Sequence, residues 1–246
     1  MADPSFRFSI DRGGTFTDVY AEVPGESGFR VVKLLSEDPQ NYPDAPREGI
    51  RRILEAVTGE TFPKESFNAD KIEWIRMGTT VATNALLERK GAKTTLVTTK
   101  GFCDLLQIGN QSRPKIFDLE ISKLDLLYEE VVEVDERVRI VREDEKNSQD
   151  SRLEIVEGTT GEEFAVLAKP DLVFVRQELE AVFEKGIRAV AVVFLHAYAF
   201  PEHERQIGVI ASEIGFEQIS LSHEVMPMVK MVARGDTTTV DAYLTP

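Results

Sequence analysis

The feature that most constrains the fold is a pair of adjacent glycines between two alternating runs near the start of the chain. Apolar residues occupy every second position from 6 to 10, and a similar alternation extends over residues 15–23. Alternation with a period of two is typical of strands that bury one face. A tight turn at Gly13 and Gly14 therefore predicts an antiparallel hairpin at the start of a sheet.

The same turn carries groups that can hold a phosphate and its metal ion. The candidate phosphate donors are the glycine backbone at Gly13 and Gly14 and the hydroxyls of Thr15 and Thr17. Two carboxylates flank them: Asp11 could hold Mg²⁺ through water, and Asp18 could also contact the ion. The alternative is an ordinary hairpin, in which the glycines only supply positive φ.

Length and composition narrow the class of protein. A chain of 246 residues with 42% hydrophobic residues suits one large or two ordinary domains. The net charge of −14, with scattered Lys and Arg, argues against a nucleic-acid partner. No stretch approaches the roughly 18 to 20 apolar residues of a membrane span, so we expect no membrane partner. The single cysteine, Cys103, favours a reducing intracellular compartment, and we interpret it as a packed thiol rather than a nucleophile.

Strand and helix patterns follow the hairpin. A strand at residues 29–34 predicts a three-stranded meander, and helical spacing over residues 50–57 predicts a helix on one sheet face. A strand at residues 72–77, a helix, and a strand at residues 94–98 predict a βαβ unit with a right-handed crossover. The sequence therefore indicates a mixed α/β fold.

The later chain continues this pattern. Approximate alternation predicts one or two solvated strands with a bulge between residues 128 and 142, followed by an exposed loop at residues 143–152. The expected later elements are a helix at 172–183, a buried strand at 189–195, a helix at 201–215 and a strand at 217–221. His196, His203 and Glu204 have some metal-ligand character, but we favour caps and core hydrogen bonds because Pro201 breaks the spacing.

A second candidate site is the turn formed by Gly78, Thr79 and Thr80. It lies at the carboxyl end of a predicted strand and at the start of a helix, where open sheets bind ligands and helix ends attract anions. A threonine N-cap is the alternative. Asn84, one helical turn further, could point toward the same mouth or toward solvent.

Residues 101–118 have little periodicity and many polar side chains, which predicts a functional loop. We take Gln107, Asn110 and Arg113 as candidate substrate contacts, because a guanidinium offers a planar fork to a carboxylate. The chain has no P-loop, dinucleotide-binding or nucleophile-elbow motif, which removes the main support for those classes.

Together these motifs resemble the hydantoinase A/5-oxoprolinase family. The matching stretches are residues 10–18, 76–91, Gly101-Phe102 with Ile108-Gly109, and residues 234–246. Within the family, the chain is most similar to the N-terminal region of the eukaryotic-type, ATP-hydrolysing 5-oxoprolinases, through residues 33–36, 49–54 and 135–138. The resemblance implies an N-terminal family domain over residues 1–230, with a solvated insertion at about 101–170, and the truncated start of a hydantoinase A domain at 231–246.

The resemblance also implies a fold and a reaction. The fold would be a ribonuclease H-like lobe, similar to those of actin, sugar kinases and chaperone ATPases, with an antiparallel meander and βα repeats. Its Asp-x-Gly-x-Thr hairpin holds the β- and γ-phosphates, and the matching positions are Asp11, Gly13, Gly14 and Thr15. The implied reaction is the ATP-dependent opening of 5-oxo-L-proline to L-glutamate, with ADP and phosphate, in the γ-glutamyl cycle of glutathione metabolism. ATP, Mg²⁺ and K⁺ are the implied cofactors.

The same resemblance implies a cytosolic homodimer whose second nucleotide-binding lobe lies in the C-terminal remainder of the protein. The isolated chain would then bind nucleotide weakly and turn over nothing. Three alternatives stay open: opening of a hydantoin or another substrate of the family, a small-molecule kinase of the same fold, and a non-catalytic regulatory domain with a vestigial phosphate turn.

Overall fold

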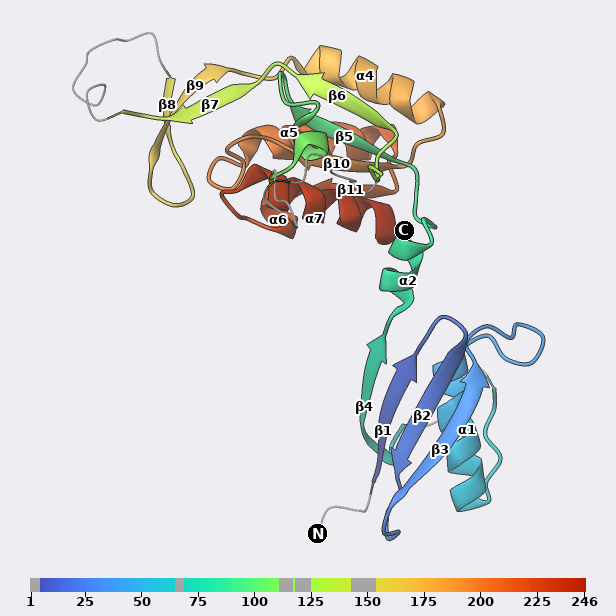
Figure 1. Ribbon diagram of the computed structural model, residues 1–246. Helices are drawn as coiled ribbons and strands as arrows, with labels where there is room; N and C mark the ends of the chain where they lie inside the picture. Colours follow the sequence, from blue (N-terminus) through green and yellow to red (C-terminus); the bar gives the residue numbers. More distant parts are fainter. Residues whose placement is uncertain (1–4, 65–68, 111–116, 118–124, 143–153) are drawn as a thin grey trace. The chain divides into compact units, whose positions relative to one another are not determined.

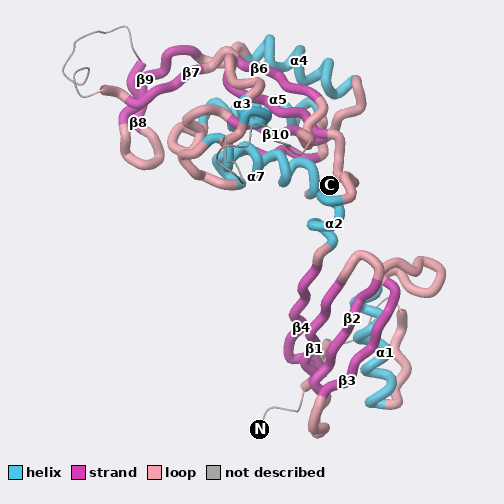
Figure 2. Tube along the Cα trace, viewed as in Figure 1, coloured by secondary structure: helices cyan, strands magenta, loops and turns pink. Residues whose placement is uncertain are grey.

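The computed structural model describes the chain except for residues 1–4, 65–68, 111–116, 118–124 and 143–153. The chain divides into two compact units, Met1–Lys90 and Gly91–Pro246 (Figures 1 and 2). Both combine helices with strands, so the expected mixed α/β class is confirmed. Each unit has its own sheet and its own hydrophobic core.

The first unit is a four-stranded mixed sheet with the order β3-β2-β1-β4. Its elements are β1 (Phe6–Arg12), β2 (Phe16–Glu22), β3 (Phe29–Leu35), α1 (Ala45–Thr58), β4 (Ile72–Thr79) and α2 (Val81–Leu87). The first three strands form the predicted antiparallel meander, and β4 lies parallel to β1. Phe8, Val19 and Ile53 belong to the buried cluster between the sheet and α1.

Local signals define helix α1 clearly. The side chain of Asp44 accepts a hydrogen bond from the Arg47 N–H at 3.0 Å, which caps the first turn. Gly59 ends the helix in the left-handed conformation with φ 73°. Between these caps, Ile50, Ile53 and Leu54 are buried, as the helical spacing predicts.

The second unit is built on a four-stranded parallel sheet with the order β11-β10-β5-β6. A separate antiparallel sheet, β7-β9-β8, joins it. The elements are β5 (Thr94–Thr99), α3 (Leu105–Ile108), β6 (Glu130–Val134), β7 (Arg137–Ile140), β8 (Glu154–Glu157), β9 (Glu163–Ala168), α4 (Leu172–Glu184), β10 (Ala189–Val193), α5 (Glu202–Ile214), β11 (Gln218–Leu221), α6 (Ser222–Val225) and α7 (Met231–Leu244).

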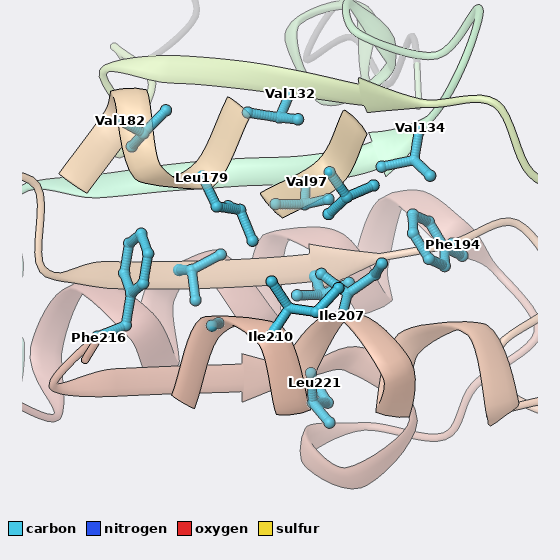
Figure 3. Close-up of a cluster of buried hydrophobic side chains, with 14 of the residues drawn as sticks. Val97, Val132, Val134, Leu179, Val182, Phe194, Ile207, Ile210, Phe216 and Leu221 are labelled. Carbon is cyan, nitrogen blue, oxygen red and sulfur yellow. The ribbon is translucent and has the colours of Figure 1, made fainter. Parts of the chain in front are cut away.

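Helices cover both faces of the parallel sheet. On one face, Leu179 of α4 and Ile207 of α5 pack against strand residues such as Val97 (Figure 3). On the other face, Met231 of α7 and residues of α3 pack against strand residues such as Leu96. Because every residue of β10 is buried, the double coverage expected from its continuous apolar run is confirmed.

The predicted βαβ unit around residues 72–98 is wrong. Strand β4 pairs with β1, whereas β5 pairs with β6 and β10 in the other sheet. The intervening helix α2 has seven residues and buries none of them, so it covers no sheet face as a crossover helix would. Strand β5 is buried at all its positions and therefore needs neighbours and cover that β4 and α2 do not supply.

Two strands, β6 and β7, lie between residues 128 and 142, where one or two solvated strands are predicted. The predicted bulge is confirmed at Arg137 and Val138, where the register between β7 and β9 shifts. Strand β6 is not a solvated strand, because it joins the parallel sheet and buries Val132 and Val134. The predicted loop at 143–152 lies outside the described residues, and the family boundary after residue 230 stays a prediction.

Candidate functional site

Strand alternation positions the first candidate carboxylate. In β1, Phe8 and Ile10 point into the core under α1, so Ser9 and Asp11 lie on the opposite face of the sheet. We call this face the outer face. Asp11 pairs with Asp18 on β2 and with Gly78 on β4. The register thus brings three of the predicted site residues side by side at one end of the sheet.

The glycine turn leaves two backbone donors unused. The N–H of Gly13 donates to the Phe16 carbonyl at 2.9 Å and closes the turn. The N–H groups of Gly14 and Thr15 make no hydrogen bond to the described part of the chain, and both residues are exposed. Two adjacent unpaired N–H groups in a turn form a ready site for an anion.

The two glycines are not required for positive φ, because neither Gly13 nor Gly14 adopts the left-handed region. The space beside Gly14 is limited by the side chain of Asn84. A Cβ at this position would lie 2.9 Å from the Asn84 amide nitrogen. The reading of an ordinary hairpin with glycines for positive φ is therefore wrong, and Asn84 is brought to the turn rather than pointing only to solvent.

A buried pair of hydroxyls anchors the turn from below. Thr17 is fully buried, and its hydroxyl lies 3.0 Å from that of Ser36, which donates to the Gly13 carbonyl at 2.7 Å. The Ser36 N–H also donates to the Thr15 carbonyl at 2.9 Å. The hydroxyl of Thr17 therefore does not reach the solvent-exposed side of the turn, where Gly14 and Thr15 lie. Ser36 was not identified as a site residue from the sequence, although it ends one of the stretches that resemble the family and directly follows the apolar end of the third strand.

The second predicted turn joins the first through Arg12. The Thr79 hydroxyl donates to the Arg12 carbonyl at 3.0 Å and accepts from the Val81 N–H at 3.2 Å. Thr80 occupies the N-cap position of α2 without capping it through its side chain, and its hydroxyl accepts from Asn84 at 3.5 Å. Thr79 therefore ties the two turns together, while Asn84 lies beside Gly14 and contacts Thr80.

The two carboxylates at the turn differ in their partners. Lys33 binds Asp18 through an ion pair of 3.0 Å. Asp11 is exposed and has no hydrogen-bond or ion-pair partner among the described residues. It lines an open depression of about 430 Å³ whose wall also includes Ser9 and Arg76. Oxygen donors of this kind suit Mg²⁺, so Asp11 fits a metal-bound nucleotide better than Asp18 does.

One cation beside the turn was not singled out from the sequence. The Arg12 guanidinium lies 4.0 Å from the Asp44 carboxylate, and its Nε is buried without a partner in the described part of the chain. Its position within the Asp-x-Gly-Gly-Thr motif is the signal that could have found it.

The remaining candidates belong to the second unit. Gln107 on α3 and Asn110 after it are exposed, and Arg113 lies outside the described residues. Cys103 is exposed, so its interpretation as a packed thiol is wrong. The pKa of its thiol is raised by local desolvation and by the Glu133 carboxylate, which disfavours the nucleophilic thiolate.

Two of the three residues considered as metal ligands, His203 and Glu204, form core hydrogen bonds, as favoured from the sequence, whereas the buried Nδ1 of His196 has no partner in the described part of the chain. His203 lies 2.8 Å from the Glu136 carboxylate, and the buried Glu204 accepts from the Phe194 N–H at 2.9 Å and the Ser222 hydroxyl at 2.6 Å. Among the residues that the structure describes, no group of three or more His, Cys, Asp or Glu could hold a metal ion. In the same described part, no helix is long and apolar enough to cross a membrane.

Comparison with known families agrees with the geometry. The model of the family described as the hydantoinase/oxoprolinase N-terminal region matches residues 7–215. The 5-oxoprolinase of Dictyostelium discoideum is 59% identical over 98% of this chain and 19% of its own length. 5-Oxoprolinase 1 of Arabidopsis thaliana is 56% identical over 100% of this chain and 19% of its own length. The chain thus spans about a fifth of the length of these relatives.

Solved structures agree at the level of the fold. An ATP-dependent caprolactamase from Pseudomonas jessenii matches 98% of this chain and 31% of its own, with a TM-score of 0.69 and 25% identity. A nucleotide-free acetone carboxylase matches 97% of this chain and 32% of its own, with a TM-score of 0.70 and 20% identity. At that lower identity the likeness concerns the fold alone.

Proposed function

The chain belongs to the hydantoinase/oxoprolinase family, and on that premise we propose that it is the N-terminal part of a 5-oxoprolinase. The complete enzyme would hydrolyse 5-oxo-L-proline to L-glutamate, coupled to the conversion of ATP to ADP and phosphate. Support comes from relatives named 5-oxoprolinase at 47 to 59% identity over the whole chain or nearly so. The remaining four fifths of such a protein would supply the rest of the enzyme.

A single observation carries the nucleotide part of the proposal. The unpaired N–H groups of Gly14 and Thr15 lie in the same turn as the unpaired carboxylate of Asp11. Donors fixed by the backbone and a nearby carboxylate suit the phosphates of ATP and their Mg²⁺. We assign the phosphate contacts to Gly14 and Thr15, with Gly13, Gly78, Thr79 and Thr80 shaping the mouth. Asp11 would hold the metal through water.

Asn84 would lie at the edge of the phosphates rather than on the lactam, because its amide is next to Gly14. We propose that the carboxylate of the lactam substrate is bound by the stretch that contains Gln107, Asn110 and Arg113. The family resemblance also implies K⁺ as a cofactor, and we propose no residue that binds it. The cytosolic location, the homodimer and the role in glutathione metabolism are likewise proposals from the family.

The chemistry explains why ATP would be needed. An unstrained amide is a poor electrophile, and transfer of a phosphoryl group to the lactam oxygen makes the ring carbon reactive toward water. Fixed N–H donors stabilise the charge on the transferring phosphate without reorganising during the reaction. Bound Mg²⁺ would supply further charge neutralisation. The chain's own part in this scheme is to orient the phosphates at the turn.

The direct test is product analysis with the complete protein and Mg-ATP, with and without 5-oxo-L-proline. We expect phosphate and glutamate to be released together and only with substrate. Phosphate release that ignores 5-oxo-L-proline would contradict the substrate, and a phosphorylated product would indicate a kinase. The likeness to a caprolactamase makes a panel of larger lactams and hydantoins the appropriate comparison.

A second test concerns the chain by itself. Because about four fifths of the related proteins lie outside it, we expect calorimetry of the 246-residue chain with Mg-ATP to give no micromolar binding. Tight binding would contradict the view that the chain forms only part of the nucleotide site.

A further inference from the structure

The outer face of the first sheet carries exposed apolar side chains on β2 and β3, on either side of the Asp18–Lys33 ion pair. They are Phe16 (46% exposed), Tyr20 (42%), Phe29 (67%), Val31 (47%) and Leu35 (44%). We call them the outer apolar face. It lies on the side of the sheet opposite α1, which covers the buried residues Val19 and Leu34 (Figure 1).

Strand register makes these side chains one surface rather than scattered exceptions. Phe16 pairs with Leu35, and Tyr20 pairs with Val31. The rings of Tyr20 and Phe29 are in contact, with 5.7 Å between their centroids. Cross-strand neighbours on one face lie close enough to form a continuous patch.

Such a pattern is unusual for a sheet face in water. An antiparallel sheet with one solvated face alternates apolar and polar residues, so its outer positions are polar. On β3 the outer positions are apolar except for Lys33, and the inner residue Leu34 is buried as well, while β2 adds Asp18 and Glu22 to the outer face. Large contiguous apolar patches on soluble proteins mark interaction surfaces. Both faces of β2 and β3 are therefore suited to being covered.

We propose that the outer apolar face is the docking surface for a segment of the same polypeptide that follows Pro246 in the complete enzyme. The segment would present apolar side chains to both parts of the outer apolar face. Between them, it would present polar groups to the Asp18–Lys33 ion pair. This inference rests on the proposed function, because it takes the chain as the first fifth of a longer protein.

The length of the relatives and the charge of the chain select this occupant. The matching family region is described as N-terminal, and four fifths of the relatives' sequence lies outside the match, so a covering segment is available in the same molecule. A second copy of this chain is disfavoured, because each copy has a net charge of −14 and two copies repel each other.

The position of the face gives the docking a functional consequence. Phe16 is the residue after the glycine turn, and the Lys33 ammonium lies 5.0 Å from its ring centroid. Asp11 and Asp18 lie on the same face of the sheet. A segment bound to the outer apolar face therefore lies close to the glycine turn. There it can supply binding groups that the first unit lacks.

Hydroxyl-radical footprinting tests the proposal, because it reads side-chain accessibility directly. The modification rates of Tyr20 and Phe29 are compared between the 246-residue chain and the complete protein, each at two concentrations. The buried Phe8 serves as an unreactive reference. We expect both rings to react readily in the short chain and to be protected at least about fivefold in the complete protein, independently of concentration.

Other outcomes overturn the proposal. High reactivity in both proteins would mean that the face is solvated. Equal protection in both would mean that this chain covers the face itself, and loss of that protection on dilution would identify a second copy. The enzymatic assay with 5-oxo-L-proline is a separate readout, so a wrong substrate assignment would leave the footprint unchanged.

A pair of variants adds a second readout. Val31→Glu places a charge on the outer apolar face, and Val173→Glu makes the same change at a residue of α4 that is 69% exposed. We expect Val31→Glu to lower the melting temperature of the complete protein by several degrees more than that of the 246-residue chain. Equal shifts in both proteins would contradict docking.

Discussion

The sheets of the two units differ in how many of their faces are covered by helices. The parallel sheet of the second unit has α4 and α5 on one face and α7 on the other, and its buried Glu204 and Arg234 are hydrogen-bonded within the unit. The first unit covers only one face of β2 and β3 and leaves N–H groups and a carboxylate unused at its glycine turn. The comparison teaches that helices cover both faces of the parallel sheet in the second unit, whereas the described part of the first unit keeps an uncovered sheet face and unused groups at its turn.

The single tryptophan makes the comparison measurable. Trp74 lies on β4 in the first unit, so its fluorescence reports unfolding of that unit, while far-UV circular dichroism reports both. Variants in one unit can therefore be tested for their effect on each unit separately.

The largest stability effect is expected from Arg234→Met. Arg234 is fully buried, donates to Ser222 at 2.9 Å and also donates to the carbonyls of Met228 and Phe194. Its removal leaves these buried acceptors without their donor and takes away a cation whose charge interacts with the buried Glu204 carboxylate, which costs about 3 to 5 kcal/mol. We expect the dichroism transition of the second unit to shift strongly.

The Trp74 fluorescence midpoint should stay unchanged in Arg234→Met. A control is Arg176→Met, whose exposed guanidinium pairs with Glu213 and should have an effect below about 1 kcal/mol. A common shift of both signals would break the comparison, because the units would then unfold together.

The next effect concerns activity at the turn. In the complete protein, Asp11→Asn should lower ATP-dependent turnover by roughly 100-fold or more, because it removes the charge that we propose orients the metal. Asp18→Asn is the matched control, since Asp18 lies directly opposite but is held by Lys33. Equal losses in both variants, measured as steady-state phosphate release, would show that the two carboxylates share the role.

The pH dependence of the first unit should depend on Glu48. Hydrogen bonds from Arg51 and then Arg52 lower the pKa of this buried carboxyl from 4.5 to about 2. A lowered folded-state pKa stabilises the protein above about pH 4.5, and this contribution is lost as the pH falls toward 2.

We therefore expect Glu48→Gln to destabilise the first unit by roughly 2 kcal/mol at neutral pH. The variant should also flatten the acid limb of its stability curve, read by Trp74 fluorescence in urea between pH 3 and 7. An unchanged acid limb would show that another carboxyl controls it.

The smallest effect is expected from Ser36→Ala. This change removes the hydroxyl that joins Thr17 to the Gly13 carbonyl and should cost about 1 kcal/mol of stability in the first unit. Because the turn loses its anchor, the apparent KM for ATP in the complete protein should rise severalfold while kcat changes less. A loss of stability with unchanged KM would limit Ser36 to a structural role.

Local signals made much of the fold predictable. The meander, helix α1 with its Gly59 cap, and the later βα repeats follow from periodicity and from glycine positions. The separation of β4 and β5 into different sheets did not follow, because strand partners are chosen by contacts far apart in sequence. The structure shows why no crossover forms there: helix α2 has seven residues and buries none of them, so it cannot cover a sheet between two parallel strands.

The candidate site divides in the same way. The motif located Asp11, Gly14 and Thr15 correctly at one turn, because they are neighbours in sequence. The contact between Ser36 and the turn depends on the register of the third strand, which no local pattern specifies. The reason for Gly14 also required the structure, since it is the approach of Asn84 rather than the backbone conformation.

The most direct test of the central claim is calorimetric titration of the complete protein with Mg-ATP, comparing the native sequence with Gly14→Ala. A methyl group at Gly14 would meet the Asn84 side chain and would narrow the space in which we propose that the phosphates bind. The control is Gly25→Ala, which strains another turn of the same unit at φ 82°.

The account predicts that Gly14→Ala weakens binding at least tenfold, or about 1.4 kcal/mol. Gly25→Ala should keep native affinity despite a lower melting temperature. Native affinity in Gly14→Ala would contradict the claim that this turn holds the nucleotide.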